Sequence, residues 1–298
     1  MLRVLAPASL LLPLFAVAAP PSQRQVYAMG TRLTVQLEGP AAEAALAEVE
    51  RIEAACSTWR PGSHWSRLNA TAGAWQPLDQ EWLQLLDRAQ AWSRRTGGAF
   101  DPVLRALLQA RGVRPDGPGQ GSHGCSLLEL DPARGRARLL QGAGIEEGAF
   151  LKGYALDAAR RASAATCGWL DLGGQLLAWG RPLRVEIADP RRRQVPRVAL
   201  DLRDASLSTS GCSERGRHLV DPRTGAACPN WGSVSVVAPS AFDADVLSTA
   251  LYVLGPEAGL AWAECNHLPA LFLFADGHHR ASGTFAALNP TFLSGECP

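Results

Sequence analysis

The sequence predicts an α+β domain with a mixed, largely antiparallel sheet flanked by helices. Segments with the alternating hydrophobicity of strands occur along the chain together with segments that have the period of amphipathic helices. They do not follow the strict strand–helix–strand order of a doubly wound sheet, which favours the α+β class. The 298 residues contain no long linker and no short-period repeat, so one continuous domain over residues 20–298 is expected.

The first half of the chain is predicted to contain one strand, two helices and a long loop. Apolar and polar residues alternate over 26–37, which predicts a strand. Apolar stripes of helical period predict helices over 41–56 and 82–92. The stretch 112–124 is rich in proline and glycine and is predicted to be a loop.

The second half is predicted to hold two helices and several short strands. The helices are expected over 152–162 and 243–254. Short apolar runs predict strands over 183–187, 198–202, 233–237 and 270–274.

The first 19 residues resemble a secretory signal peptide. Arg3 precedes an apolar run over 10–17, and Ala16-Val17-Ala18 has the small residues of a cleavage site. We therefore expect an exported, periplasmic protein cleaved near Ala18 or Ala19.

The bulk composition excludes some classes of partner. The formal net charge is +1, and the simplest interpretation of the run Arg191-Arg192-Arg193 is a solvated turn, so no nucleic-acid partner is expected. The seven cysteines suit an oxidising compartment, and their spacings do not match a zinc site. Cys265 with Cys297 and Cys212 with Cys228 are two conceivable pairs, but the spacing does not decide the connectivity.

Lys152 is the first residue suspected of chemistry, because it is the single lysine beside 28 arginines. A compact ammonium meets a phosphate as a point charge, whereas an arginine presents a planar fork. The alternative is a leftover surface lysine. Its place at the start of a predicted helix leaves both interpretations open.

Two glycine-rich segments are candidates for ligand contact. Gly119 to Gly124 matches the spacing G-x-G-x-x-G, but no apolar strand leads into it, so we interpret it as a loop. Asp171 is followed by Gly173 and Gly174, and two such glycines let backbone amides approach an anion or a carbonyl-rich ring. A plain tight turn is the alternative for the second segment.

Asp245 and Thr249 are the candidate metal ligands. They are four residues apart on a predicted helix and therefore share a face. One carboxylate with one hydroxyl is a thin protein shell of the kind magnesium accepts. The alternative is that the carboxylates lie near the start of the helix only because the helix dipole stabilises negative charge there.

His218 opens a short apolar run that ends in a proline and glycine turn. It could be a core histidine or a base held over a site. No G-x-S-x-G segment supports a serine nucleophile.

Taken in order, these segments resemble the ApbE family of FAD:protein FMN transferases over nearly the whole chain after the signal peptide. Trp59 stands where the family usually has tyrosine, and Cys212 stands where an acidic or polar residue is more usual. The matching segments are Ala28-Met29-Gly30-Thr31, Cys56 to Ser63 with Ser66 to Asn69, Gly98 to Pro102, Ala149 to Asp157, Asp171 to Gly174, Thr209-Ser210-Gly211, His218 to Gly225, and Asp245 to Thr249.

The resemblance implies Mg²⁺-dependent transfer of FMN from FAD to a threonine or serine of a partner protein, with release of AMP. It implies an acceptor with a flavinylation-type motif, expected to be a membrane or periplasmic redox subunit. An FAD pyrophosphatase, or a non-catalytic flavin-binding protein, is the alternative. By matching position, Asp245, Thr249 and the carbonyl of Ala149 would ligate magnesium, and catalysis would involve His218, Asp245 and Lys152. The residues expected around FAD are Met29, Trp59, Asn69, Asp101, Lys152, Gly173, Gly174, Ser210, Gly211 and His218.

Overall fold

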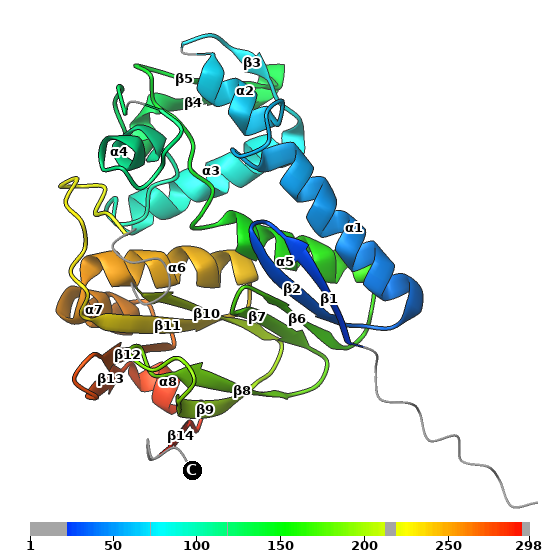
Figure 1. The fold of residues 1–298 in the computed structure, drawn as a ribbon, viewed down its shortest axis with the longest axis vertical. Coiled ribbons are helices and arrows are strands. Elements are labelled where there is room, and N and C mark those ends of the chain that lie inside the picture. The colour runs from blue at the N-terminus through cyan, green and yellow to red at the C-terminus, as the bar shows by residue number, and fades with distance from the viewer. Residues whose placement is uncertain (1–22, 72, 118, 212–218, 294–298) are drawn as a thin grey trace, which may run out of the picture.

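An eight-stranded antiparallel sheet forms the centre of the fold, as the computed structural model shows (Figure 1). The structure describes residues 23–71, 73–117, 119–211 and 219–293. In spatial order the strands of this sheet are β1 (Gln23–Ala28), β2 (Thr31–Gln36), β6 (Gly168–Leu172), β7 (Gln175–Trp179), β10 (Ala205–Gly211), β11 (Gly232–Ala238), β12 (Ala270–Phe274) and β13 (His279–Ala281).

The remaining described strands form two smaller sheets. One lies below the large sheet in Figure 1 and the other lies at the top of the molecule. The lower sheet contains β14 (Thr291–Phe292), β9 (Pro196–Leu202) and β8 (Leu183–Ala188). The upper sheet contains β3 (Gln76–Pro77), β5 (Arg136–Leu139) and β4 (Leu128–Asp131).

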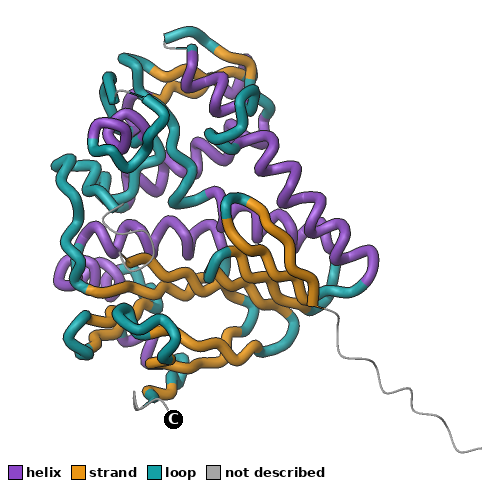
Figure 2. Tube along the Cα trace, viewed as in Figure 1, coloured by secondary structure: helices purple, strands orange, loops and turns teal. Residues whose placement is uncertain are grey.

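Seven of the described helices lie above the large sheet, as Figure 2 shows. They are α1 (Gly39–Cys56), α2 (His64–Ala70), α3 (Gln80–Arg95), α4 (Arg105–Ala110), α5 (Leu151–Ser163), α6 (Ala241–Leu254) and α7 (Pro256–Cys265). Of these, α1, α5, α6 and α7 contact the strands of the large sheet. Short α8 (Gly283–Ala286) lies with the lower sheet, and two 3₁₀ turns cover Cys125–Leu127 and Pro132–Arg134.

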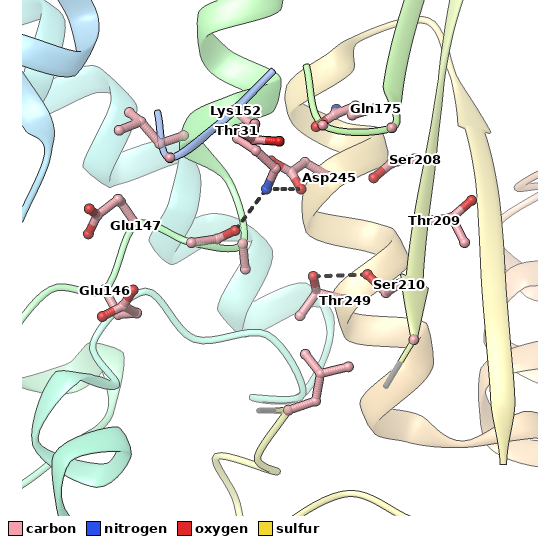
Figure 3. A pocket seen from close by; sticks show the side chains of 18 of the residues that line it. Thr31, Glu146, Glu147, Lys152, Gln175, Ser208, Thr209, Ser210, Asp245 and Thr249 are labelled. Atoms are coloured by element: carbon pink, nitrogen blue, oxygen red, sulfur yellow. Dashed lines mark hydrogen bonds and ion pairs between the residues drawn. The ribbon is translucent and has the colours of Figure 1, made fainter. Parts of the chain in front are cut away.

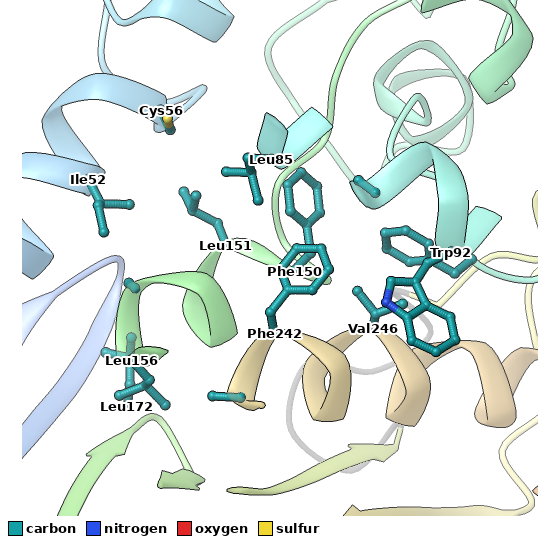
Figure 4. Packing of buried hydrophobic residues seen from close by; sticks show 14 of the residues in the cluster. Ile52, Cys56, Leu85, Trp92, Phe150, Leu151, Leu156, Leu172, Phe242 and Val246 are labelled. Carbon is teal, nitrogen blue, oxygen red and sulfur yellow. The ribbon is translucent and has the colours of Figure 1, made fainter. Parts of the chain in front are cut away.

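The large sheet is buried on both faces in its β12 region, which explains why β12 has a continuous apolar sequence. In β12, Ala270 and Phe272 pack into the helical core, whereas Leu271 and Leu273 pack against the lower sheet. The helical core centres on Phe150, which contacts the rings of Trp65, Phe100 and Phe242. Figure 4 shows this cluster joining α5 and α6 to residues of α1 and α3.

The predicted class, α+β with a largely antiparallel sheet, is confirmed, and every described ladder is antiparallel. The four predicted helices and the four short strands of the second half are present, with bounds shifted by at most three residues. Sequence reasoning placed only the end of β6, before Gly173, and it did not predict several other elements, among them β7 and β10 of the large sheet. No described helix is both long and apolar enough to cross a membrane.

The single strand predicted over 26–37 is wrong, because the segment folds into the hairpin β1–β2. Met29 and Gly30 have φ values of +50° and +73°. Two successive residues with positive φ make the tight turn whose twist matches a two-residue hairpin. The chain therefore reverses direction at Met29, although the alternation of apolar and polar residues continues through the turn and gives no sign of it.

Candidate active site

A cavity of about 1170 Å³ lies between the upper helices and the glycine turns of the large sheet. Of the thirteen residues predicted for the site, eleven line it, one does not, and one lies outside the described residues. The lining residues among them are Met29, Trp59, Asp101, Ala149, Lys152, Gly173, Gly174, Ser210, Gly211, Asp245 and Thr249. Asn69 is not among the lining residues, and His218 lies outside the described residues, as does Cys212.

Helices α5 and α6 bring Lys152 and Asp245 together (Figure 3). Lys152 lies in the first turn of α5, and its Nζ is 3.7 Å from Asp245 Oδ1 and donates to the carbonyl of Gly148 at 3.1 Å. The amide of Gly153 donates to Asp245 Oδ2 at 3.0 Å. A carboxylate beside the ammonium offsets the unfavourable position of a cation at a helix N-terminus.

Gly153 is what allows this close approach of the two helices. A Cβ at this position would lie 2.3 Å from the carbonyl oxygen of Ala241 and 2.7 Å from Cα of Phe242. The glycine after the lysine is therefore a packing requirement. Asp157, one turn later on α5, accepts hydrogen bonds from Ser240 Oγ and from the amides of Ala241 and Phe242 at the start of α6.

Asp245 is buried, with 4% of its surface exposed. Burial raises the pKa of its carboxyl, and the charge of Lys152 and the hydrogen bonds from Gly153 and Lys152 oppose that rise. No group of three or more His, Cys, Asp or Glu residues that could hold a metal occurs among the described residues. A cation here would therefore depend on one carboxylate together with hydroxyl and carbonyl oxygens.

A row of hydroxyl groups continues from Asp245 along α6 toward β10. Ser248 Oγ donates to the carbonyl of Asp245, and it lies 3.1 Å from Ser208 Oγ and 2.9 Å from Ser210 Oγ. Ser210 Oγ is 3.4 Å from Thr249 Oγ1. These two serine side chains of β10 therefore face α6, the helix that carries the candidate metal ligands Asp245 and Thr249.

The turn between β6 and β7 forms the glycine wall of the cavity. Gly173 and Gly174 have φ values of +63° and +87°, and Asp171 holds the turn by accepting from the Gly174 amide at 2.7 Å. Burial raises the pKa of Asp171, and the hydrogen bond from Gly174 opposes this. A Cβ at Gly173 would lie 2.7 Å from the side chain of Thr31, so glycine is required there.

Gln175, directly after this turn, is a site residue that sequence reasoning missed. Its Nε2 donates to the carbonyl of Ala241 at 2.7 Å, which fixes the orientation of the amide. Its Oε1 is buried and has no hydrogen-bond partner among the described residues. The side chain lines the cavity with 3% of its surface exposed. Buried acceptors rarely stay unpaired, so this atom suits a ligand N–H or O–H.

Sequence reasoning also missed Arg114, Glu146 and Glu147 on the opposite wall. Arg114 donates to Glu146 Oε2 at 2.8 Å, and its guanidinium lies 4.0 Å from the centre of the Trp59 ring. The pKa of Glu146 is raised to about 7, first by burial and then by the charge of Glu147, while Arg114 opposes the rise. Two successive glutamates just before Gly148 were the available signal for this pair.

Trp59 itself is 61% exposed, so the face of its ring away from Arg114 is free to contact a planar ligand. Asp101 is fully engaged with the protein. It accepts from the amides of Val103 and Cys125, each at 2.8 Å, and burial raises its pKa against those bonds.

Asn69 does not line the cavity but supports its wall through the backbone of Ile145. Its side-chain amide exchanges two hydrogen bonds with the backbone of Ile145, at 2.7 and 3.1 Å. Ile145 precedes Glu146, so Asn69 positions the segment that leads to Lys152. Both cysteine pairings that the sequence suggested involve residues outside the described ranges, Cys212 and Cys297.

The fold and the cavity define a class: an α+β ligand-binding domain in which a lysine, a buried carboxylate and a glycine turn meet at one cavity. The chain belongs to the ApbE family, whose family model matches residues 29–272. It is 33% identical to the FAD:protein FMN transferase of Treponema pallidum, covering 84% of this chain and 83% of that protein.

Solved structures agree with this assignment. The ApbE protein of Thermotoga maritima superposes with a TM-score of 0.82 at 26% identity, covering 90% of this chain and 98% of that one. The apo form of the flavinyl transferase ApbE of Pseudomonas stutzeri gives 0.79 at 27% identity, covering 90% and 96%. The curated relatives are transferases by name.

Proposed function

We propose that this chain is an FAD:protein FMN transferase that moves FMN from FAD to a threonine or serine hydroxyl of an exported or membrane redox protein. The observation that carries the proposal is the contact of Lys152 with Asp245 on the wall of a cavity of about 1170 Å³. Pockets for small ligands usually measure about 300–1,000 Å³, so this one has room for a dinucleotide. Membership of the ApbE family supports the same activity.

FAD fits the polar groups of the cavity. The unpaired Oε1 of Gln175 would accept a hydrogen bond from one of the N–H or O–H groups of FAD. The exposed face of Trp59 offers a stacking surface for one of its rings. Lys152 would meet the pyrophosphate as a point charge.

Magnesium fits the oxygen atoms around Asp245. This carboxylate is buried, and Lys152 is the one cationic group that a described ion pair places beside it. Asp245, Thr249 and the carbonyl of Ala149 would hold the ion, because magnesium prefers oxygen ligands and needs few of them from protein. When bound, it would supply polarisation of the pyrophosphate oxygens.

In the proposed reaction, the acceptor hydroxyl oxygen forms a bond to the phosphorus on the FMN side of the pyrophosphate. The bond from that phosphorus to the bridging oxygen breaks, and AMP leaves with the electron pair. Such transfers depend mainly on positioning and on neutralising charge, which is the role proposed for Lys152. His218, which lies outside the described residues, would accept the hydroxyl proton, and Asp245 is the alternative base.

An assay of two matched variants on α6 tests this assignment. Asp245→Asn should abolish magnesium-dependent transfer of FMN to an acceptor domain, while FAD binding weakens less. Asp243→Asn is the control, because Asp243 contacts Arg88 and Trp92 and does not line the cavity. Undiminished transfer by Asp245→Asn would remove Asp245 from the mechanism.

We also propose that the chain is exported to the periplasm. The support is the sequence of residues 1–19, which lie outside the described residues. The N-terminal sequence of the protein recovered from a periplasmic extract tests this: it should begin near Ala19 or Pro20. An intact Met1 on cytoplasmic protein would contradict export.

A further inference from the structure

As far as the described residues go, strand β1 leaves one edge of the large sheet open. It is the outermost strand, and its single strand partner among the described residues is β2. Open edges of this kind are usually blunted because they recruit other strands. The open edge of β1 ends at the turn Met29-Gly30, and both of these residues line the cavity.

The hairpin register shows which backbone groups face outward. A two-residue turn makes Ala28 and Thr31 a hydrogen-bonded pair, and pairs of this kind recur at every second residue. Arg24 and Val26 are therefore bonded to β2, whereas Gln23, Gln25 and Tyr27 direct their N–H and C=O groups to the open edge. Within the described ranges, no backbone bond to these outward groups is formed.

The side chains near the cavity end of this edge are exposed and apolar. Tyr27 is 79% exposed and Val26 is 39% exposed, and Tyr27 also lines the cavity. Farther from the cavity, Arg24 pairs with Glu43 of α1. Thr31, which follows the turn, lines the same cavity as Lys152. A chain running along β1 would thus arrive at the residues proposed to hold the pyrophosphate.

We propose that the acceptor protein docks by adding a strand to the open edge of β1, with Tyr27 contacting it beside the reactive hydroxyl. This rests on the proposed function, since a protein acceptor must bring a hydroxyl from its surface into the cavity. The six residues of β1 span about 20 Å, enough to align a short extended segment. Strand addition holds a peptide through its backbone and so leaves its side chains free to vary.

Gln25 offers a sharp test, because proline removes one outward N–H and is tolerated at such edge positions. The probe is the same recombinant acceptor domain that the transfer assay uses. Gln25→Pro should raise the KM for this domain about tenfold, the effect expected for losing one hydrogen bond and distorting its neighbour. The dissociation constant for FAD should change less than twofold. Gln25→Ala keeps the N–H and should behave as wild type.

Hydrogen exchange supplies a second measurement that needs no variant. With an acceptor domain whose threonine is replaced by alanine, the amides of Gln25 and Tyr27 should become protected. An unchanged KM for Gln25→Pro, or no new protection at these amides, would overturn the docking site. A dimer that Gln25→Pro converts to a monomer would assign the edge to a second copy instead. If wild type transfers no flavin at all, the proposed function has failed, and the exchange measurement still decides the docking site.

Discussion

Asp157 is predicted to hold the site together by joining α5 to the start of α6. Its carboxylate accepts from Ser240 Oγ at 2.7 Å and from the amides of Ala241 and Phe242 at 2.8 and 3.0 Å. Ala241 and Phe242 are fully buried. Removing the carboxylate therefore leaves amides that water reaches poorly.

The cost of Asp157→Ala follows from these three bonds. Helix N-cap substitutions cost about 0.5–2 kcal/mol, and an unsatisfied buried donor costs about 1–3 kcal/mol. We expect a loss of about 2–4 kcal/mol in the free energy of unfolding. Asp157→Asn keeps one oxygen acceptor without the charge and should lose about half as much. Because α6 carries Asp245, both variants should also slow FMN transfer.

Urea denaturation followed by tryptophan fluorescence measures this loss. Asp131→Ala is the matched control, since Asp131 also accepts from a backbone amide, that of Arg134, and pairs with arginines at the surface. Surface pairs of this kind contribute at most about 1 kcal/mol. If Asp157→Ala loses no more stability than Asp131→Ala, the capping argument is refuted.

Three further variants address the cavity. Lys152→Arg keeps the charge but replaces a point donor with a planar fork, so transfer should fall more than tenfold, by roughly 1.4 kcal/mol or more; a fully active variant would show that the lone lysine is incidental. Because the pKa of Glu146 is raised to about 7, its ionisation adds negative charge to the wall of the cavity proposed to bind FAD. FAD affinity measured by titration should fall several-fold from about pH 6 to about pH 8, and Glu146→Gln should flatten that dependence; an unchanged pH profile would place Glu146 outside the binding site. Gln175→Leu should weaken FAD binding about 3- to 10-fold, the effect of one hydrogen bond of about 1 kcal/mol; equal affinity in calorimetry would mean that Oε1 does not meet the ligand.

Much of the fold was predictable because it depends on local patterns. The amphipathic period of α3 and the apolar run of β12 follow directly from which faces they bury. Strand β10 was missed because its sequence, Ala205–Gly211, is rich in serine. The hydroxyls of Ser208 and Ser210 pair with Ser248, which lies about 40 residues away in sequence, and Ser206 donates to the carbonyl of Leu176. The periodicity of a local sequence window contains no information about such long-range pairing.

The candidate site shows the same division. Ordered motifs indicated Lys152, Asp245 and the glycine turn, and the structure places them on one cavity. They could not indicate Gln175, because its significance is an unpaired oxygen that exists only once β7 packs beside Ala241. Asn69 matched a motif, yet its amide bonds the backbone of Ile145. A motif therefore indicates which residues belong to the site, whereas the role of each residue depends on the contacts that its side chain makes.

The central claim is that FMN passes from FAD to a protein hydroxyl. The most direct measurement is a product balance after incubation with FAD, magnesium and the acceptor domain. The account predicts covalent flavin on the acceptor and AMP in equal amounts, with transfer absent when the acceptor threonine is replaced by alanine. Equal amounts of free FMN and AMP without covalent flavin would contradict it and would identify a hydrolase of FAD.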